Sequence, residues 1–262
     1  MVLQQAGSPL LPGSGVPGIA RHLRASGRHG GLTQKRRIRC GAYTRPMDRD
    51  GIFEHISSLR RTTRQPLIVG ISGYAGSGKS TLARFLAESL PGAVRLRGDD
   101  FLDPCRSHQR SSDWDGVDRT RLVTEVLDPL RQERPGTFRR FDWSTRSLAD
   151  PEPLPRTDLL IVDLIGLFHP DALPHLDIRI WCDVELDVAA RRGIARDRAL
   201  GRDHEALWHD VWIPNERDFD RHHTPRERAE ILFEASSASH RRPSEASPPD
   251  SATIEPSKRS RP

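Results

Sequence analysis

The stretch "GYAGSGKSTLA", Gly73 to Ala83, decides the fold that this sequence predicts. Its first eight residues fit the pattern G-x-x-x-x-G-K-[ST] without a mismatch, directly after the apolar run "PLIVGIS". Glycines at these positions let successive backbone N–H groups turn inward around a phosphate, and the following helix adds the positive end of its dipole. We expect the loop to bind ATP through Gly73, Tyr74, Ala75, Gly76, Ser77, Gly78, Lys79, Ser80 and Thr81.

The lysine of this loop stands out because the chain uses so few lysines. Of its 41 Lys and Arg residues only Lys35, Lys79 and Lys258 are lysines. Lys35 and Lys258 lie in polar segments near the two ends, which show no apolar periodicity. Lys79 is therefore the one lysine expected in the folded part, where it reaches the outer phosphates, while the hydroxyl of Ser80 binds Mg²⁺.

Apolar runs alternate with helical patterns on either side of the loop. This alternation predicts a three-layer α/β fold of the P-loop NTPase kind, with a mainly parallel five-stranded sheet between helices. Ligands are then expected beyond the carboxyl ends of the strands. The predicted strands are Leu67–Ser72, Ala93–Arg97, Asp158–Asp163, Ile178–Asp183 and Glu230–Phe233; the predicted helices are Lys79–Leu90, Arg119–Arg131, Glu185–Leu200 and His204–Trp212.

Charge divides the chain into three parts. Residues 1–47 carry eight basic side chains and no acid, and residues 236–262 carry five basic and three acidic ones. Residues 48–235, the predicted folded domain, hold 28 basic and 33 acidic side chains, a net charge of −5. The sequence pI of about 9.6 therefore comes from the ends. Nucleic-acid binding by the domain is not indicated; only the basic leader could provide it.

Both ends have the composition of disordered segments. An Arg-rich leader without acids is also typical of a transit peptide or a nucleic-acid-binding arm. A different interpretation stays open: Met47 begins "MDRDGIFEHISSLRR", an amphipathic helix that would suit a natural start. The low-complexity tail, 236–262, is expected to be a mobile end.

Cysteine usage and hydropathy bear on the compartment. Cys40, Cys105 and Cys182 are far apart and lack metal-ligand spacing, which favours reduced thiols in a cytoplasmic protein. No apolar stretch approaches the roughly 18 residues that a membrane helix needs. We therefore expect no membrane partner, and a homo-oligomer remains open.

Three acids follow predicted strands next to the loop. Asp163 ends "LLIVD", where a carboxylate would hold Mg²⁺ together with Ser80. Asp99 and Asp100 follow the strand that ends in "RLRG". An acceptor hydroxyl needs a carboxylate that orients it and accepts its proton, and this pair could supply one.

Four further motifs resemble the uridine kinase family of P-loop kinases, which is itself similar to pantothenate kinase and phosphoribulokinase. They are "DDFL" (99–102), "DWDGVD" (113–118), "RRFDWSTRS" (139–147) and "ARRGIARDRALGRD" (190–203). The resemblance extends from about Pro66 to Ala235. It implies a kinase fold with a helical lid that closes over the phosphates.

The resemblance also implies site residues. Asp99 takes the place of the catalytic base, and Asp115 that of the acid that binds the sugar hydroxyls. Phe141 and Trp143 stand where aromatic rings enclose the substrate. Arg192 and Arg196 match lid arginines, which neutralise the charge of the transferring phosphoryl group beside Lys79.

Three positions depart from the family pattern. Arg146 replaces a histidine, Leu148 replaces an arginine, and Leu164 replaces the glycine after the strand-ending acid. The first two help to read a pyrimidine in the family, so uridine or cytidine is not indicated here. A guanidinium at position 146 would suit an anionic acceptor.

These patterns leave three hypotheses. The first is an ATP- and Mg²⁺-dependent kinase that phosphorylates a hydroxyl of a small molecule, with a nucleoside as the expected acceptor. The second is a kinase of an anionic acceptor (a nucleoside monophosphate, a pantothenate-like acid or a sugar phosphate) that Arg110 and Arg146 would bind. The third is a non-catalytic nucleotide-binding regulator that contacts nucleic acid through its leader.

Overall fold

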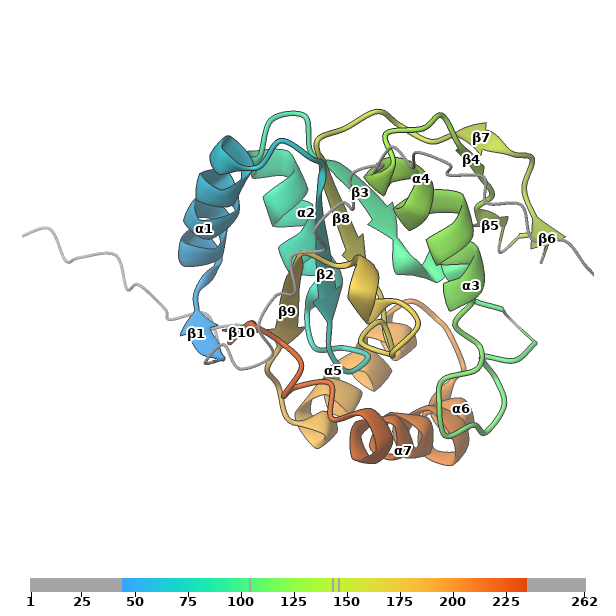
Figure 1. The fold of residues 1–262 in the computed structure, drawn as a ribbon. Helices are drawn as coiled ribbons and strands as arrows, with labels where there is room; N and C mark the ends of the chain where they lie inside the picture. Colours follow the sequence, from blue (N-terminus) through green and yellow to red (C-terminus); the bar gives the residue numbers. More distant parts are fainter. Residues whose placement is uncertain (1–43, 104, 143, 146, 235–262) are drawn as a thin grey trace, which may run out of the picture. The chain divides into compact units, whose positions relative to one another are not determined.

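The computed structural model describes residues 44–103, 105–142, 144–145 and 147–234, and its centre is a parallel sheet (Figure 1). The predicted leader up to residue 43, the tail, Trp143 and Arg146 lie outside the described residues. Across the sheet the strands are β1 (Arg45–Met47), β10 (Ile231–Phe233), β9 (Ile178–Cys182), β2 (Leu67–Ser72), β8 (Leu159–Asp163) and β3 (Val94–Arg97).

The central strands have the composition that a parallel sheet requires. Every residue of β2, "LIVGIS", and of β8, "LLIVD", is buried. Strands covered on both faces need such continuous apolar runs. The five predicted strands are all present within one residue of their expected bounds, and the prediction of a parallel sheet is confirmed.

The prediction of five strands was one strand short. The sixth, β1, pairs in parallel with β10 at the edge of the sheet, with Arg45 opposite Ile231. Its residues "RPM" belong to the segment that the sequence analysis assigned to the leader. Three residues with an arginine and a proline show no apolar run, so only pairing with β10 makes them a strand.

Helices cover both faces of the sheet, which confirms the three layers (Figure 1). On one face, α1 (Arg49–Thr62) and α2 (Lys79–Ser89) pack against side chains such as Val69 of β2. On the other face, the helix formed by α3 (Arg119–Leu122), a π-helical turn (Val123–Leu127) and α4 (Asp128–Arg131) packs against side chains such as Ile68.

The lid region is longer than predicted. After α5 (Leu186–Ala199) the chain forms α6 (Glu205–Leu207), a π-helical turn (Trp208–Trp212) and α7 (Ile213–His223). The expected end at Trp212 was wrong, because the π-helical turn carries the helix past Pro214. A proline inside a helix removes one backbone hydrogen bond, and such a turn accommodates the loss.

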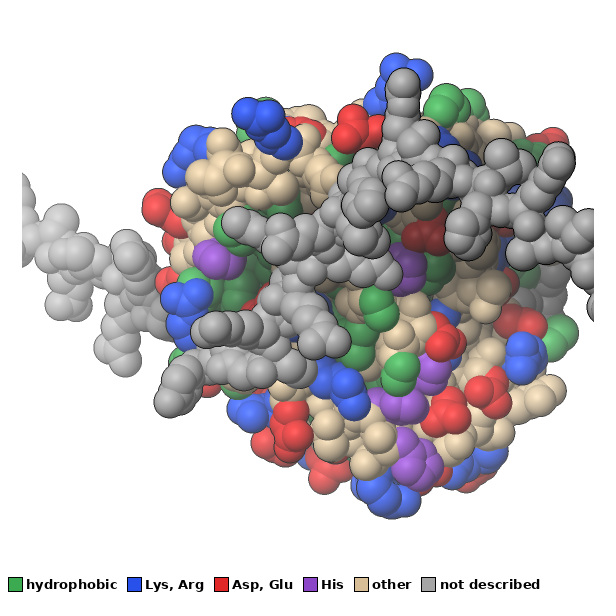
Figure 2. Space-filling model, in the orientation of Figure 1, with side chains coloured by type: hydrophobic (Ala, Val, Ile, Leu, Met, Phe, Trp, Pro, Cys, Tyr) green, Lys and Arg blue, Asp and Glu red, His purple; other side chains and the backbone are tan. Residues whose placement is uncertain are grey.

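Short elements complete the described fold. They are the 3₁₀ turns Gly98–Phe101 and Leu173–His175, the antiparallel pair β4 (Thr137–Phe138) and β7 (Glu152–Pro153), and the pair β5 (Phe141–Asp142) and β6 (Ser147–Leu148). The turn Gly98–Phe101 follows the carboxyl end of β3, whereas Leu173–His175 precedes the amino end of β9. Among the described helices, none is both long and apolar enough to cross a bilayer. On the face drawn in Figure 2, acidic and basic side chains are interspersed.

Candidate functional site

The predicted phosphate-binding loop connects β2 to α2. Gly76 and Gly78 have φ angles of +87° and +102°, a region that glycine adopts without strain. A Cβ at Gly76 would lie 2.1 Å from the carbonyl oxygen of Ala189 on α5. The glycine therefore permits the lid helix to touch the loop directly.

Lys79 is buried at the base of the loop, with 8% of its surface exposed. Its Nζ donates hydrogen bonds of 2.8 Å to the carbonyls of Gly73 and of Tyr74. Burial lowers the pKa of this lysine, while electrostatic interactions with Glu216, Cys182, Asp163 and Asp99 raise it. The acids predicted from the sequence thus lie within electrostatic reach of the predicted lysine.

Ser80 and Asp163, the predicted Mg²⁺ residues, are in contact. The Ser80 hydroxyl donates a 2.7 Å hydrogen bond to Asp163 Oδ2. Arg95 of β3, which the sequence analysis missed, donates to both oxygens of the same carboxylate, at 2.7 Å and 2.9 Å. An arginine between two apolar residues of the predicted strand was the available signal, because a guanidinium that is largely withdrawn from water needs an acidic partner.

The donor set fits Mg²⁺. Among the described residues no group of three or more His, Cys, Asp or Glu side chains could hold a metal. Mg²⁺ usually takes one or two carboxylates and completes its shell with waters and substrate phosphates, so a larger protein cage is not required. Each carboxylate oxygen has two lone pairs. Asp163 Oδ1 accepts a hydrogen bond from Arg95 through one lone pair, so the other lone pair can bind a metal ion.

The structure separates the two adjacent acids. Asp99 exposes 62% of its side chain and lies 3.6 Å from Arg97. Asp100 is buried and pairs with Arg140 at 3.0 Å; burial raises the pKa of its carboxyl, although Arg140 opposes this. Asp99 is therefore the accessible carboxylate, and Asp100 is part of the internal packing.

Asp115 lies at a small polar cavity of about 190 Å³. Its side chain is exposed, and its backbone N–H donates a 3.0 Å hydrogen bond to the Ser111 hydroxyl. Three further acids line this cavity and were not assigned from the sequence: Asp118 belongs to the same motif as Asp115, and Asp103 and Asp171 come from two other segments. The other lining residues are Asp103, Arg106, Val117, Asp118, Arg119, Thr120 and Asp171.

The guanidinium of Arg119, at this cavity, is already engaged. It donates hydrogen bonds to the carbonyls of Gly166, at 2.9 Å, and Asp113, at 2.6 Å. Burial lowers its pKa to about 10. Its bond to Gly166 stabilises the loop that follows β8.

Of the other predicted substrate residues, the structure describes only Phe141. Phe141 lies in β5 with 7% of its surface exposed, so little of its ring is open to a substrate. Trp143 and Arg146 lie outside the described residues, so the structure does not place them.

The two predicted lid arginines are on α5. Both Arg192 and Arg196 are exposed, and Arg196 pairs with its neighbour Asp197 at 3.0 Å. Asp197 is buried and accepts a 2.9 Å hydrogen bond from the indole of Trp208. The helix that carries the arginines thus touches the loop at Gly76, while its outer side faces solvent.

A second residue to which the sequence analysis assigned no role is Glu216 of α7. It is 4% exposed, and its Oε1 accepts a 2.7 Å hydrogen bond from the backbone N–H of Ala75 in the loop. Burial raises the pKa of its carboxyl to about 7, although Lys79 opposes this. A single glutamate in "WIPNERDF" gives no local signal for such a contact.

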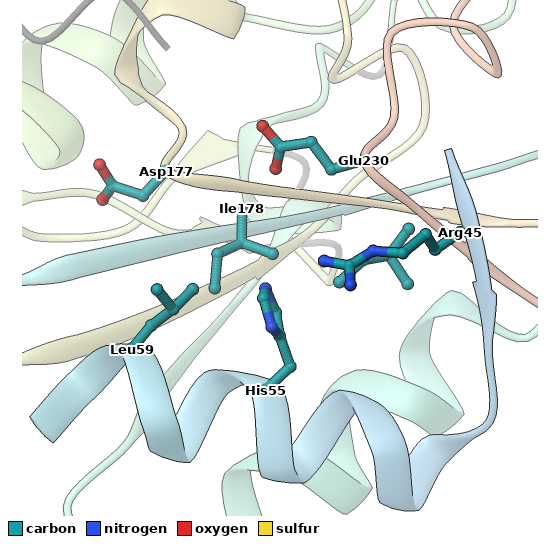
Figure 3. Close-up of a pocket in the computed structure, with 7 residues that line it drawn as sticks. Arg45, His55, Leu59, Asp177, Ile178 and Glu230 are labelled. Carbon is teal, nitrogen blue, oxygen red and sulfur yellow. The ribbon is translucent and has the colours of Figure 1, made fainter. Parts of the chain in front are cut away.

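A larger cavity, of about 480 Å³, lies away from the phosphate-binding loop (Figure 3). Arg45, His55 and Glu230 are among its lining residues, between α1 and the amino ends of β9 and β10. The phosphate-binding loop follows the carboxyl end of β2, so it lies at the opposite ends of the parallel strands. This cavity is therefore not part of the candidate site.

Comparisons with known proteins agree with this geometry. A family model described as an AAA domain matches residues 68–137. A curated uridine kinase from Alkaliphilus metalliredigens is 32% identical over 145 residues, which cover 51% of this chain and 69% of the relative. Uridine kinase-like protein 4 of Arabidopsis thaliana is 27% identical over 164 residues, 56% of this chain but 35% of the relative's own length.

A solved structure shares the fold. The possible uridine kinase from Bacillus stearothermophilus superposes with a TM-score of 0.52 at 19% identity, covering 70% of this chain and 99% of the other. A relative that is 32% identical, of which this chain covers more than two thirds, carries the assignment, and the superposed fold agrees with it. This chain belongs to the uridine kinase-like family of P-loop kinases.

Proposed function

We propose that this P-loop kinase transfers the terminal phosphoryl group of ATP to a hydroxyl of a small, hydroxyl-rich molecule, with a nucleoside as the expected acceptor. The observation that carries the proposal is the arrangement around Lys79. Its buried ammonium group feels the charges of Asp163, which Ser80 contacts, and of the accessible Asp99. The residues proposed for phosphate, metal and acceptor binding therefore follow strand ends on one side of the sheet.

Each residue then has a task that its geometry allows. The loop amides and Lys79 bind the triphosphate, and Ser80 with Asp163 would hold Mg²⁺. The metal, when bound, supplies neutralisation of phosphate charge. Asp99 orients the acceptor hydroxyl and accepts its proton, while Arg192 and Arg196 stabilise the transferring group. In phosphoryl transfer such positioning and charge stabilisation account for most of the catalysis.

The charge of the small polar cavity supports a neutral acceptor. Its lining contains four carboxylates (Asp103, Asp115, Asp118 and Asp171) against Arg106 and Arg119. Carboxylates accept hydrogen bonds from hydroxyl groups and repel phosphates and carboxylic acids. An acceptor with several hydroxyl groups fits this lining better than an anionic one.

The hypothesis of an anionic acceptor depended on Arg110 and Arg146. Arg110 is engaged on α7, where it bonds to Asn215 and lies 2.6 Å from Asp218. Arg146 lies outside the described residues. No described contact therefore favours this second function, and the same holds for a regulator that would act through its leader.

The test is an ADP-release screen with the full chain, ATP and Mg²⁺. Candidate acceptors are nucleosides, nucleoside monophosphates, pantothenate and sugar phosphates. We expect stimulation by neutral hydroxyl-rich acceptors, with a KM that changes little with salt because screening weakens only charged contacts. Stimulation by phosphorylated acceptors alone, with a strongly salt-dependent KM, would support the anionic alternative. Nucleotide binding without any stimulation would support the regulator.

A further inference from the structure

The starting point is the peptide unit between Tyr74 and Ala75 in the phosphate-binding loop. Lys79 Nζ donates to the carbonyl of Tyr74 at one end of this unit, and Glu216 accepts from the N–H of Ala75 at the other. In a trans peptide unit the carbonyl and the N–H point in opposite directions. The lysine and the glutamate therefore hold the same peptide from its two sides and fix its rotation.

A second contact joins the same helix to the loop. Asp220, one turn after Glu216 on α7, interacts electrostatically with Tyr74: burial raises the pKa of this tyrosine, and Asp220 raises it further. Residues four apart lie on one helix face. Two acids of α7 thus lie toward two consecutive residues of the loop, and Glu216 makes the directed contact.

The carboxyl of Glu216 is buried and interacts with three other side chains. Lys79 and Trp114 lower the pKa of its carboxyl, and Asp220 raises it. The buried indole N–H of Trp114 falls outside hydrogen-bonding geometry with any acceptor in the described part of the chain. The hydrogen bond to Ala75 is therefore the principal directed contact of this carboxylate.

The neighbouring residue, Asn215, is fully buried and points to another segment. Its Oδ1 accepts from the backbone N–H of Ser111 at 2.9 Å, and its Nδ2 donates to the carbonyl of Gln109 at 2.9 Å. The Ser111 hydroxyl in turn accepts from the N–H of Asp115. Consecutive residues of α7 thus hold the phosphate loop and the segment 109–115, which carries an acid of the polar cavity.

From these contacts we infer that Glu216 is a positioning residue, which fixes the loop peptide that orients Lys79, and that through Asn215 it couples nucleotide binding to the segment 109–115. The inference rests on the proposed function, because it concerns the nucleotide loop of that same site. It assigns no chemistry to Glu216, which acts through the loop.

The first test measures binding of a non-hydrolysable ATP analogue with Mg²⁺ by calorimetry. Glu216→Ala removes the acceptor, and a charge-assisted hydrogen bond of this kind supports a loss of affinity of roughly tenfold or more. Glu216→Gln keeps an oxygen facing Ala75, so we expect an affinity within about threefold of wild type. Glu88→Gln, an exposed glutamate near the far end of α2, is the matched control.

Two results would overturn the positioning role. One is an alanine variant that binds the analogue as well as the Glu88→Gln control. The other is an equal loss in both Glu216 variants, which would indicate that charge matters and the hydrogen bond does not. A wild-type chain that ignores the analogue would refute the proposed function itself, and this outcome differs from either variant result.

A second readout serves if the alanine variant fails to fold. The amide signal of Ala75 in an NMR spectrum of wild type should titrate with a midpoint near pH 7, and in Glu216→Gln it should not. For the coupling, hydrogen exchange of residues 109–115 should slow when the analogue binds wild type, and this slowing should be lost in Asn215→Ala. An amide that does not titrate, or exchange that the analogue leaves unchanged, would contradict the respective part.

Discussion

Ser80 donates a 2.7 Å hydrogen bond to Asp163, although 83 positions separate them, and Arg95 holds both oxygens of the same carboxylate. Asp163 exposes 4% of its side chain and Arg95 exposes 18%. Arg95→Met would leave a buried carboxylate without its partner, which costs about 3–5 kcal/mol. We expect a loss of stability of this order in urea unfolding.

The same variant tests the metal site. Mg²⁺ should restore part of the lost stability in Arg95→Met and change wild type less, because the cation replaces the missing positive charge. Arg97→Met, on the same strand but 55% exposed, is the control and should change stability little. Equal responses to Mg²⁺ in wild type and Arg95→Met would argue against metal binding by Asp163.

Loss of charge at the two adjacent acids should affect different properties: turnover at Asp99 and stability at Asp100. Asp99→Asn removes an exposed carboxylate, so we expect turnover to fall by roughly 10²–10⁴-fold with stability and nucleotide affinity nearly unchanged. Asp100→Asn weakens the buried pair with Arg140 and should cost about 1–3 kcal/mol of stability. Steady-state kinetics, calorimetry and thermal unfolding separate these outcomes. Parallel losses of turnover and nucleotide binding in Asp99→Asn would mean a structural or metal role for Asp99.

Glu216 predicts a pH dependence of stability. Its pKa is about 7 in the folded chain against 4.5 for a glutamate in water, so the folded state holds the extra proton between these values. Stability is then fully present below pH 4.5 and is lost as the pH rises through about 7. By linkage the loss is on the order of 3 kcal/mol.

The measurement compares wild type with Glu216→Gln by denaturant unfolding at several pH values. The difference between the two isolates this carboxyl from other titrating groups. We expect the stability of wild type relative to the variant to fall between pH 4.5 and 7. A constant difference across this range would show that the Glu216 carboxyl does not titrate there.

Loss of a lid arginine should lower turnover much more than it lowers nucleotide affinity. Arg192→Ala should lower turnover by roughly 10²-fold or more, because a cation that stabilises the transferring group acts mainly in the transition state. Nucleotide affinity should change by only a few fold. Arg191→Ala, the exposed neighbour on α5, is the matched control for loss of one positive charge. Similar turnover in both variants would remove Arg192 from the proposed mechanism.

Local patterns predicted much of the fold. The buried strands β2 and β8 and the loop between β2 and α2 could be recognised because each is encoded within about ten consecutive residues: apolar runs, fixed glycines and a lysine. Strand β1 and helix α7 could not. The first has too few residues for a pattern, and the second continues through a proline because of the π-helical turn before it.

Part of the candidate site could also be predicted from the sequence. Ser80 and Asp163 were predicted as a pair because parallel strands place their carboxyl ends at one edge, and the structure brings them into contact. Arg95 and Glu216 were not predicted, since each acquires its meaning only from a partner far along the chain. Asp103 and Asp171 reach the cavity of Asp115 from two other segments in the same way.

By itself, the sequence determined the phosphate-loop motif and the parallel α/β architecture, and it named the residues that we propose face a triphosphate, because backbone conformation and apolar periodicity are local properties. Tertiary structure alone decided that Asp99 is accessible while Asp100 is buried, that Arg95 holds the carboxylate of Asp163, and that Glu216 holds the loop from α7. These relationships depend on which side chains lose water and which charges meet, and that is settled only when distant segments pack together.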